Sequence, residues 1–140
     1  VMALNKAVND LERIGDEAKI IAQKTLSIHA RGGRPHDGIS LEMDRLATIA
    51  SQRVQGALDS LARLDVNQAW TLVRTDKAED LFQDILRSLG ACPVDGELAL
   101  ASVIDVALAL KALQRVADRA QNLAEYVIYI VEGQDVRHGL

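Results

Sequence analysis

A segment near the beginning of the chain returns, altered, near its end. Residues 10–22 read Asp-Leu-Glu-Arg-Ile-Gly-Asp-Glu-Ala-Lys-Ile-Ile-Ala, and residues 112–124 read Ala-Leu-Gln-Arg-Val-Ala-Asp-Arg-Ala-Gln-Asn-Leu-Ala. An offset of 102 residues aligns Leu11 with Leu113, and four further pairs are then identical: Arg13/Arg115, Asp16/Asp118, Ala18/Ala120 and Ala22/Ala124. A repeat of such long period indicates a duplicated group of secondary-structure elements. A long helical pattern precedes the second copy but not the first, so the sequence predicts one complete unit plus the last element of another.

The composition favours helices and excludes some classes of function. Hydrophobic residues make up 49% of the 140 residues but aromatic residues only 3%, so Ala, Leu, Ile and Val must build the core, as in close helix packing. The net charge of −4 argues against a nucleic-acid-binding surface. The single cysteine, Cys92, excludes an internal disulfide and favours a reducing cytoplasm. We expect no signal peptide or membrane span, because charges occur throughout residues 1–20 and the longest apolar stretch, 98–110, is short.

Breaks in the helical pattern divide the chain into four segments. Gly and Pro fall together in residues 32–38 and 90–96, where they are expected to end helices, and Asp65 with Gln68 resembles a capping box. We therefore predict helices over 2–31, 40–64, 66–90 and 97–132. Connections this short make consecutive helices antiparallel neighbours, so the predicted fold class is an all-α antiparallel bundle.

Two of these helices carry informative apolar patterns. In the first, one buried face is predicted from the spacing of Leu11, Ile14, Ala18, Ile21 and Thr25. In the last, residues 98–113 are apolar nearly all round, which predicts a central position in the bundle.

Acidic side chains one helical turn apart are the candidate functional residues. Glu12 and Asp16 form such a pair, Asp76 and Asp80 repeat the spacing, and Asp118 follows Gln114 by four residues. Like charges at this spacing cost a helix about 0.2–0.5 kcal/mol per pair, so something must offset them. Nearby Arg and Lys side chains could do so on a solvated face. A hard metal ion held between helices by carboxylate oxygens could also do so, and both interpretations stay open.

Signatures of catalysis are missing from the sequence. It contains no His-x-x-x-His, no Glu-x-x-His, no Gly-rich phosphate loop and no Cys-x-x-Cys, and its serines have helix-surface, capping or packing positions. The sequence therefore gives no positive indication of an enzyme.

Three segments carry a resemblance to the PhoU family: residues 10–18, their weaker copy, and the ending 124–138, which reads Ala-Glu-Tyr-Val-Ile-Tyr-Ile-Val-Glu-Gly-Gln-Asp-Val-Arg-His. The chain resembles this family over essentially its whole length. The resemblance implies two tandem three-helix bundles, of which residues 1–33 are the last helix of an incomplete first repeat and residues 39–140 a complete second repeat. The family's acidic metal motif corresponds to Glu12/Asp16, to Asp76/Asp80 and to Asp118. Gln114 stands where the family has an acid, so fewer charged metal ligands remain in the second bundle. Ala117 also replaces the usual Gly. Iron, or another ion such as Zn, Mn, Mg or Ni, is the implied cofactor, with a metal-free protein as the alternative.

The resemblance also implies a function without turnover. Family members are cytoplasmic negative regulators that link the ATPase subunit of a phosphate ABC transporter to a sensor histidine kinase, without binding nucleic acid and reaching the membrane only through partners. In the family, the stripe through Leu11, Ile14 and Ile21 is covered by helices not found in this sequence, so we expect a homodimer with those residues at the contact. Two other classes remain open: a helical interaction module without a phosphate role, and a carboxylate-metal enzyme.

Overall fold

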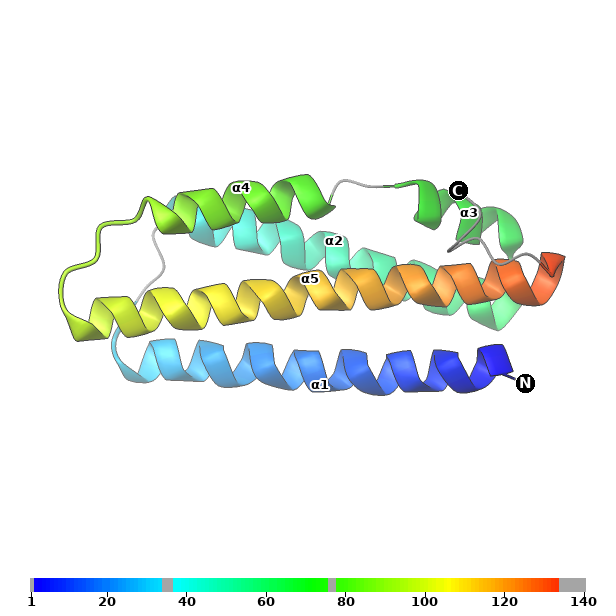
Figure 1. Ribbon diagram of the computed structural model, residues 1–140, viewed down its shortest axis with the longest axis horizontal. Coiled ribbons are helices and arrows are strands. Elements are labelled where there is room, and N and C mark those ends of the chain that lie inside the picture. Colours follow the sequence, from blue (N-terminus) through cyan, green and yellow to red (C-terminus); the bar gives the residue numbers. More distant parts are fainter. Residues whose placement is uncertain (1, 34–36, 76–77, 134–140) are drawn as a thin grey trace.

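The computed structural model describes residues 2–33, 37–75 and 78–133. Within these ranges the chain forms five α-helices and no strand: α1 (Met2–Ala30), α2 (Asp37–Arg63), α3 (Val66–Arg74), α4 (Ala78–Gly90) and α5 (Glu97–Glu132). Figure 1 shows α1 and α5 side by side along the whole length of the bundle, with α2 behind them and α3 and α4 sharing the remaining position. The predicted all-α antiparallel bundle is confirmed.

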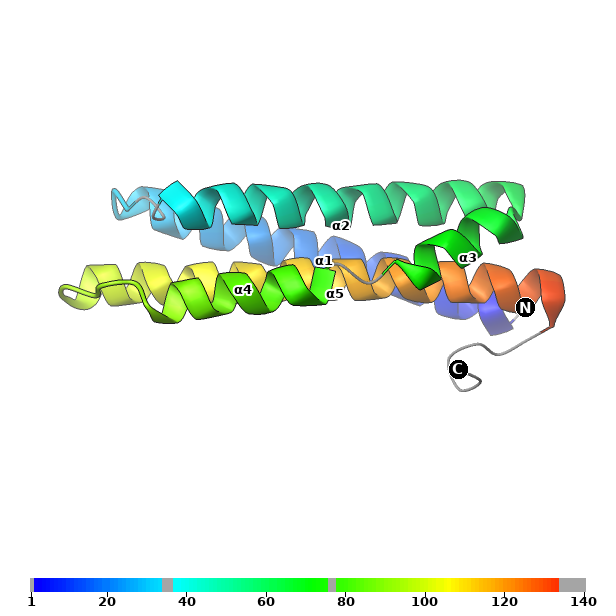
Figure 2. The ribbon, with the colours of Figure 1, turned by 90° about the horizontal axis from the view of Figure 1, so that it is seen from above.

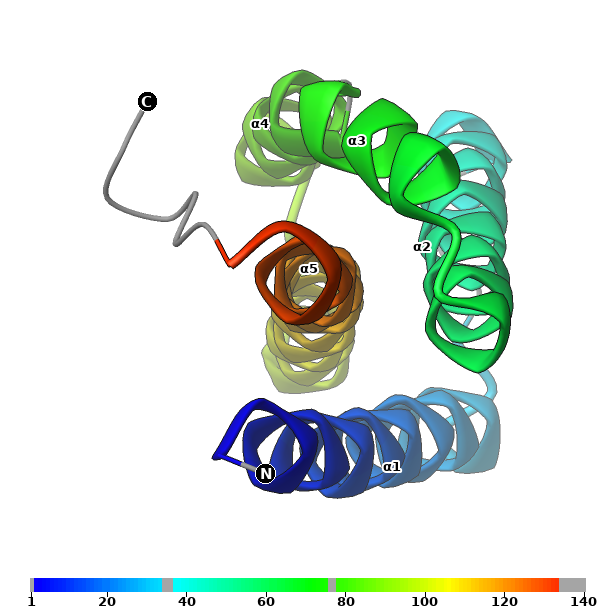
Figure 3. The same cartoon turned by 90° about the vertical axis from the view of Figure 1, so that its right-hand side faces the viewer.

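The long helix α5 forms the centre of the structure. It packs against each of the other four helices, and its contact with α1 is the most extensive (Figure 3). Leu110, Leu123 and Ile128 have no exposed surface, and Val127 is equally buried. Fully burying a Leu or Ile side chain stabilises a fold by about 1.5–3 kcal/mol, so this helix supplies a large share of the core energy. The predicted central position of α5 is confirmed. The stretch 98–113 on which the prediction rested is not buried all round, because Leu98, Ile104 and Leu108 are 66, 49 and 45% exposed.

The predicted helix over 66–90 is wrong in one respect, because it is two helices. Helix α3 ends at Arg74, and Thr75 takes an extended conformation while its N–H donates to Leu72 O over 3.3 Å. The buried guanidinium of Arg53, on α2, donates from Nη2 to the carbonyl oxygen of Thr75. This bond from a distant part of the chain stabilises the break, which local sequence does not reveal. Figure 2 shows α3 running obliquely from the end of α2 before the chain enters α4.

Three helix boundaries follow recognisable capping chemistry. The Asp65 side chain accepts a hydrogen bond from Gln68 N at 3.1 Å, as the capping pattern predicted. Gly32, just after α1, and Gly133, just after α5, take left-handed backbone conformations. Their N–H groups donate hydrogen bonds to carbonyl oxygens in the last turn of each helix. Helix α2 ends differently, because Leu64 has a φ of 51° in the position where glycine is usual.

Helix α1 packs on its own chain. Ala3, Ala7 and Ile28 are buried in core clusters that contain α5 residues, and Leu11, Ile14 and Ile21 are half-buried against those clusters. The expectation that the stripe through these last three residues lacks cover within the chain is therefore corrected. Two other members of the predicted buried face, Ala18 and Thr25, are exposed. The face that α1 turns inward is rotated relative to the predicted one, because α5 contacts it from the side of Asp10 and Glu17.

Candidate functional site

Ion pairs between α1 and α5 determine which acidic residues of α1 face inward. Asp10, which is 2% exposed, accepts a hydrogen bond from Arg119 Nη1 at 2.8 Å. Glu17 is also buried, and its Oε1 lies 3.7 Å from Arg115 Nη1. Each pair joins an acid of α1 to an arginine of α5, so together they set the register between the two helices.

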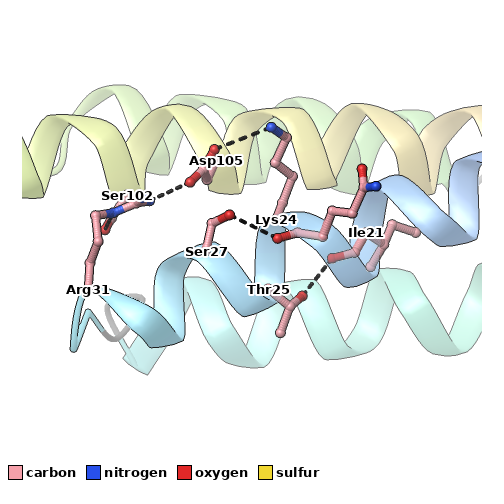
Figure 4. Close-up of polar contacts among 8 residues, drawn as sticks. Ile21, Lys24, Thr25, Ser27, Arg31, Ser102 and Asp105 are labelled. Atoms are coloured by element: carbon pink, nitrogen blue, oxygen red, sulfur yellow. Dashed lines mark hydrogen bonds and ion pairs between the residues drawn. The ribbon is translucent and has the colours of Figure 1, made fainter.

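A third polar contact joins the far ends of the same helices (Figure 4). The buried carboxylate of Asp105 pairs with the guanidinium of Arg31 and lies 3.7 Å from Lys24 Nζ. Arg31 also donates from Nε to Ser102 Oγ at 3.4 Å. The hydrogen bond from Arg31 is the largest influence on Asp105 and, with the charges of Arg31 and Lys24, holds its pKa below the ordinary value despite the opposing effect of burial. This cluster is structural, and the sequence pattern gave no indication of it.

The predicted metal residues of α1 lie outside this ladder of ion pairs. Glu12 and Asp16 are both exposed and one turn apart, as their spacing predicted. They form what we call the first acidic face. Because two carboxylates fill only part of the coordination shell of a hard cation, this face alone offers an incomplete site.

Of the other predicted metal residues, the structure describes Asp80 and Asp118, and both are exposed. Asp76 lies outside the described residues. The α4 carboxylate that reaches α5 is instead Glu79, whose Oε2 accepts a hydrogen bond from Gln114 Nε2 at 2.7 Å. The side-chain amide of Gln114 is buried, and its Oε1 accepts a bond of the same length from Lys111 Nζ. We call Glu79, Lys111, Gln114 and Asp118 the second acidic face.

Electrostatics differ between the two carboxylates of this second face. The pKa of Glu79 is lowered, first by the hydrogen bond from Gln83 and then by that from Gln114; burial opposes these effects, and the charge of Lys111 adds the smallest lowering. The pKa of Asp118 is raised, because neighbouring protein atoms displace part of its hydration and because the charge of Glu79 opposes ionisation. Asp118 itself is exposed at the surface of the chain.

Sequence reasoning missed both Glu79 and Lys111. Glu79 adjoins Asp80 but does not share the four-residue spacing on which the prediction relied. Lys111 lies three residues before Gln114 and therefore on the same side of α5, a spacing that could have indicated it. Within the described part of the chain, no three His, Cys, Asp or Glu side chains are grouped so that they could hold a metal ion.

The internal repeat exposes a further feature of α1. At the offset of 102 residues, six exposed apolar residues of α1 correspond to residues of α5 that are all buried. The α1 residues, which we call the open face, are Leu4, Val8, Gly15, Ala18, Ala22 and Leu26. Their counterparts are Val106, Leu110, Ala117, Ala120, Ala124 and Ile128, with exposures of 5, 0, 1, 1, 0 and 0%.

Those α5 residues lie in core clusters that also contain residues of α2, α3 and α4. In the end-on view of Figure 3, α1 lies at the edge of the bundle with none of the described helices on its outer side. The open face of α1 thus remains exposed, although the α5 residues that align with it are packed against other helices. An exposed apolar helix face of this kind is suited to bind another helix.

These features define a class of protein: an all-α bundle around one long helix, whose distinguishing surfaces are an apolar helix face and two acidic faces. None of the described helices is long and apolar enough to cross a membrane.

Comparison with known proteins identifies the family within this class. Residues 43–127 match the PhoU domain. The chain is 36% identical over 139 residues to a phosphate-specific transport system accessory protein PhoU homolog of Pseudomonas aeruginosa, and 37% identical over 141 residues to one of Burkholderia sp. The crystal structure of PhoU from Pseudomonas aeruginosa matches with a TM-score of 0.87 and 34% sequence identity, over 95% of this chain and 63% of that one. The chain belongs to the PhoU family, whose members are non-catalytic regulatory proteins.

The chain spans little more than half the length of these relatives. The alignments cover 99% of this chain but 57% of the Pseudomonas aeruginosa protein and 59% of the Burkholderia protein. For the PhoU of Escherichia coli (strain K12), at 31% identity, the shares are 99% and 56%.

Proposed function

We propose that this chain is a regulator of phosphate homeostasis that restrains high-affinity phosphate uptake and the phosphate-starvation response. The observation that carries the proposal is that 99% of the chain aligns, at 36% identity, with a phosphate-specific transport accessory protein whose solved fold it shares. A role in binding rather than turnover agrees with a structure whose notable features are helix faces.

The proposed mechanism is that of an adaptor in the cytoplasm. The chain engages the ATPase subunit of a phosphate ABC transporter and a sensor histidine kinase, and it reports transporter state to the kinase through contact. A stiff bundle suits this task because the ion pairs between α1 and α5 hold those two helices in one register, so a surface on one helix keeps its place relative to the other. Exposed helical faces can also lie in grooves of partner proteins.

Self-association through the open face is the second part of the proposal. Leu4, Val8 and Leu26 are 53, 56 and 69% exposed, and the small side chains between them allow close approach of a second helix. Pairing two copies across this face would bring the first acidic face of each chain near the other. Four carboxylates, two from each copy of Glu12 and Asp16, would then be available to a bridging iron, manganese or zinc ion.

A reporter experiment tests the regulatory role. In a bacterium lacking its own PhoU-family gene, the chain should reduce expression from a phosphate-starvation promoter in phosphate-rich medium. The variant Val8→Glu/Leu26→Glu, which alters the open face, should restrain the promoter less. If the full-length Pseudomonas aeruginosa relative restores control while the chain, present in equal amount, has no effect, the proposal fails. The alternative of an interaction module without a phosphate role would then be preferred.

Direct binding provides the complementary test. The purified chain should retain the transporter ATPase subunit and the cytoplasmic part of the kinase in a pull-down, whereas an unrelated helical bundle should retain neither. Failure to retain either partner would contradict the adaptor mechanism even if the reporter responds.

A further inference from the structure

Two substitutions on α5 make the second acidic face less negative than the first: Lys111 replaces Asn9, and Gln114 replaces Glu12. The offset that aligns Glu12 with Gln114 and Asp16 with Asp118 also aligns Asn9 with Lys111. The first copy therefore has Asn, Glu and Asp at these three positions, and the second has Lys, Gln and Asp. One negative charge has been lost and one positive charge has appeared on the same side of the helix.

The structure shows what the lysine does at this position. Lys111 Nζ donates to Gln114 Oε1 at 2.7 Å, and Gln114 Nε2 donates to Glu79 Oε2 at 2.7 Å. The orientation of the amide follows from chemistry, because an ammonium can only donate hydrogen bonds and a carboxylate can only accept them. A continuous chain of donors thus connects the ammonium on α5 to the carboxylate on α4.

The remaining oxygen of Glu79 is also engaged. Its Oε1 accepts a hydrogen bond from Gln83 Nε2 at 3.0 Å, one turn along α4. The Lys111 ammonium itself lies 5.5 Å from the centre of the Phe82 ring, a favourable position for a cation over an aromatic face. Glu79, Lys111 and Gln114 are thereby held in place by partners within the chain.

A divalent ion does not fit this arrangement. It would have to share the Glu79 carboxylate with two hydrogen-bond donors, compete with Lys111 for the Gln114 oxygen, and approach the positive charge of Lys111. The described residues of α4 and α5 that contact one another here therefore do not match the metal motif that the family resemblance implies.

We propose that Lys111 is a built-in counter-ion that takes the place of a metal ion in the second acidic face. Metal binding by this chain is then confined to the first acidic face, where the position that aligns with Lys111 is the uncharged Asn9. The inference rests on the geometry of α4 and α5 and does not depend on the regulatory role proposed above.

Metal titration of matched variants tests the proposal. The full chain, stripped of metal with a chelator, is dialysed against Mn²⁺ or Zn²⁺ alone, and the bound metal is measured by elemental analysis. In the background Glu12→Gln/Asp16→Asn, which removes the first face, the protein should bind no stoichiometric metal. Adding Lys111→Asn and Gln114→Glu, which restores the residues of the first copy, should create a site that binds at least about tenfold more tightly than with Gln114→Glu alone.

Two outcomes would overturn the inference. One is stoichiometric metal in the background variant that disappears with Glu79→Gln/Asp118→Asn, since the second face would then bind metal with Lys111 in place. The other is a restored variant that keeps its helical circular dichroism and melting temperature but gains no metal.

A measurement on the unmodified chain covers the case in which the multiple variant does not fold. Stoichiometric Zn²⁺, which is diamagnetic and therefore affects only nearby groups, should leave the side-chain amide NMR shifts of Gln114 unchanged, and a change in those shifts would overturn the proposal.

Discussion

Two neighbouring residues of α5 illustrate how differently single side chains contribute to this fold. Leu110 has no exposed surface and lies in the main core cluster with residues of α2 and α4. Asp105, five residues earlier, is also buried, but it is stabilised by ion pairs with Lys24 of α1 and with Arg31, which directly follows α1. The first contributes through burial of apolar surface, and the second contributes only while its charge and its partners are present.

Replacing Leu110 with Ala should lower the free energy of unfolding by about 2–5 kcal/mol, because the truncated side chain leaves a cavity in a packed core. The matched control is Leu108→Ala on the same helix, since Leu108 is 45% exposed and its truncation should cost less than about 1 kcal/mol. Urea unfolding followed by circular dichroism measures both. Equal losses at the two positions would mean that the inward face of α5 has been misassigned.

Replacing Asp105 with Asn should cost about 1–3 kcal/mol at neutral pH, because the charged partner of Arg31 is removed from a buried site. The loss should depend on pH. The folded-state pKa of Asp105 is below its unfolded value of about 3.9, so its contribution is fully present above that value and is lost as the pH falls through the lower folded value.

Unfolding measured between neutral pH and pH 3 checks this dependence. The difference between parent and Asp105→Asn should be constant near neutrality and should shrink below about pH 4. The exposed residue Asp59 on α2 supplies a control, Asp59→Asn, for the general effect of charge removal. A difference that does not change with pH would show that the carboxylate charge contributes nothing at this site.

At the scale of the helices, local chemistry accounts for three of the described ends and a distant contact for another. The caps at Asp65, Gly32 and Gly133 follow from residue type. The break between α3 and α4 depends on Arg53 of α2, which bonds to the carbonyl of Thr75. The end of α2 is unusual, because Leu64 has a left-handed backbone although its side chain is 50% exposed and gains little from burial.

The variant Leu64→Gly should raise the free energy of unfolding by about 0.5–1 kcal/mol, because glycine reaches this backbone conformation without the steric cost that a Cβ imposes. Leu64→Ala is the control, since it removes the same apolar surface but keeps the Cβ, and it should give no gain. Thermal unfolding of the three proteins measures the effect. If Ala and Gly are equally stabilising, the exposed leucine side chain and not the backbone is the source of the strain.

At the scale of the whole molecule, one helix separates the packed interior from the open face. Helix α1 buries one side against α5, and its other side remains exposed even though the equivalent side of α5 is packed. This arrangement distinguishes residues needed for folding from residues available for assembly. Ile14 and Ile21 belong largely to the first group, whereas Val8 and Leu26 belong to the second.

The proposed homodimer can therefore be tested without disturbing the core. Sedimentation equilibrium at micromolar concentration should give a dimer mass for the parent and a monomer mass for Val8→Glu/Leu26→Glu, with unchanged helical content. The control Ile14→Asp should instead reduce stability, because Ile14 packs against the core of its own chain. A parent that is monomeric at these concentrations would mean that the open face does not pair two copies.

The sequence was sufficient to predict the fold class and the likeness to a known family. Helical periodicity is a local property, and glycine, proline and capping residues mark helix ends through the backbone conformations that they favour. For this reason the all-α bundle, the position of α5 and the cap at Asp65 were all predicted correctly. The internal repeat was also visible in the sequence, because two copies of a pattern can be recognised without knowledge of their surroundings.

Only the tertiary structure decided which side of each helix faces a neighbour. Asp10 and Glu17 are buried while Glu12 and Asp16 are exposed, although all four acids lie within three turns of the same helix. Glu79, rather than Asp80, reaches Gln114. The physical reason is that a few tens of degrees of helix rotation exchanges a buried side chain for an exposed one. That rotation is set by the ion pairs and packing with α5, which lies about a hundred residues away along the chain.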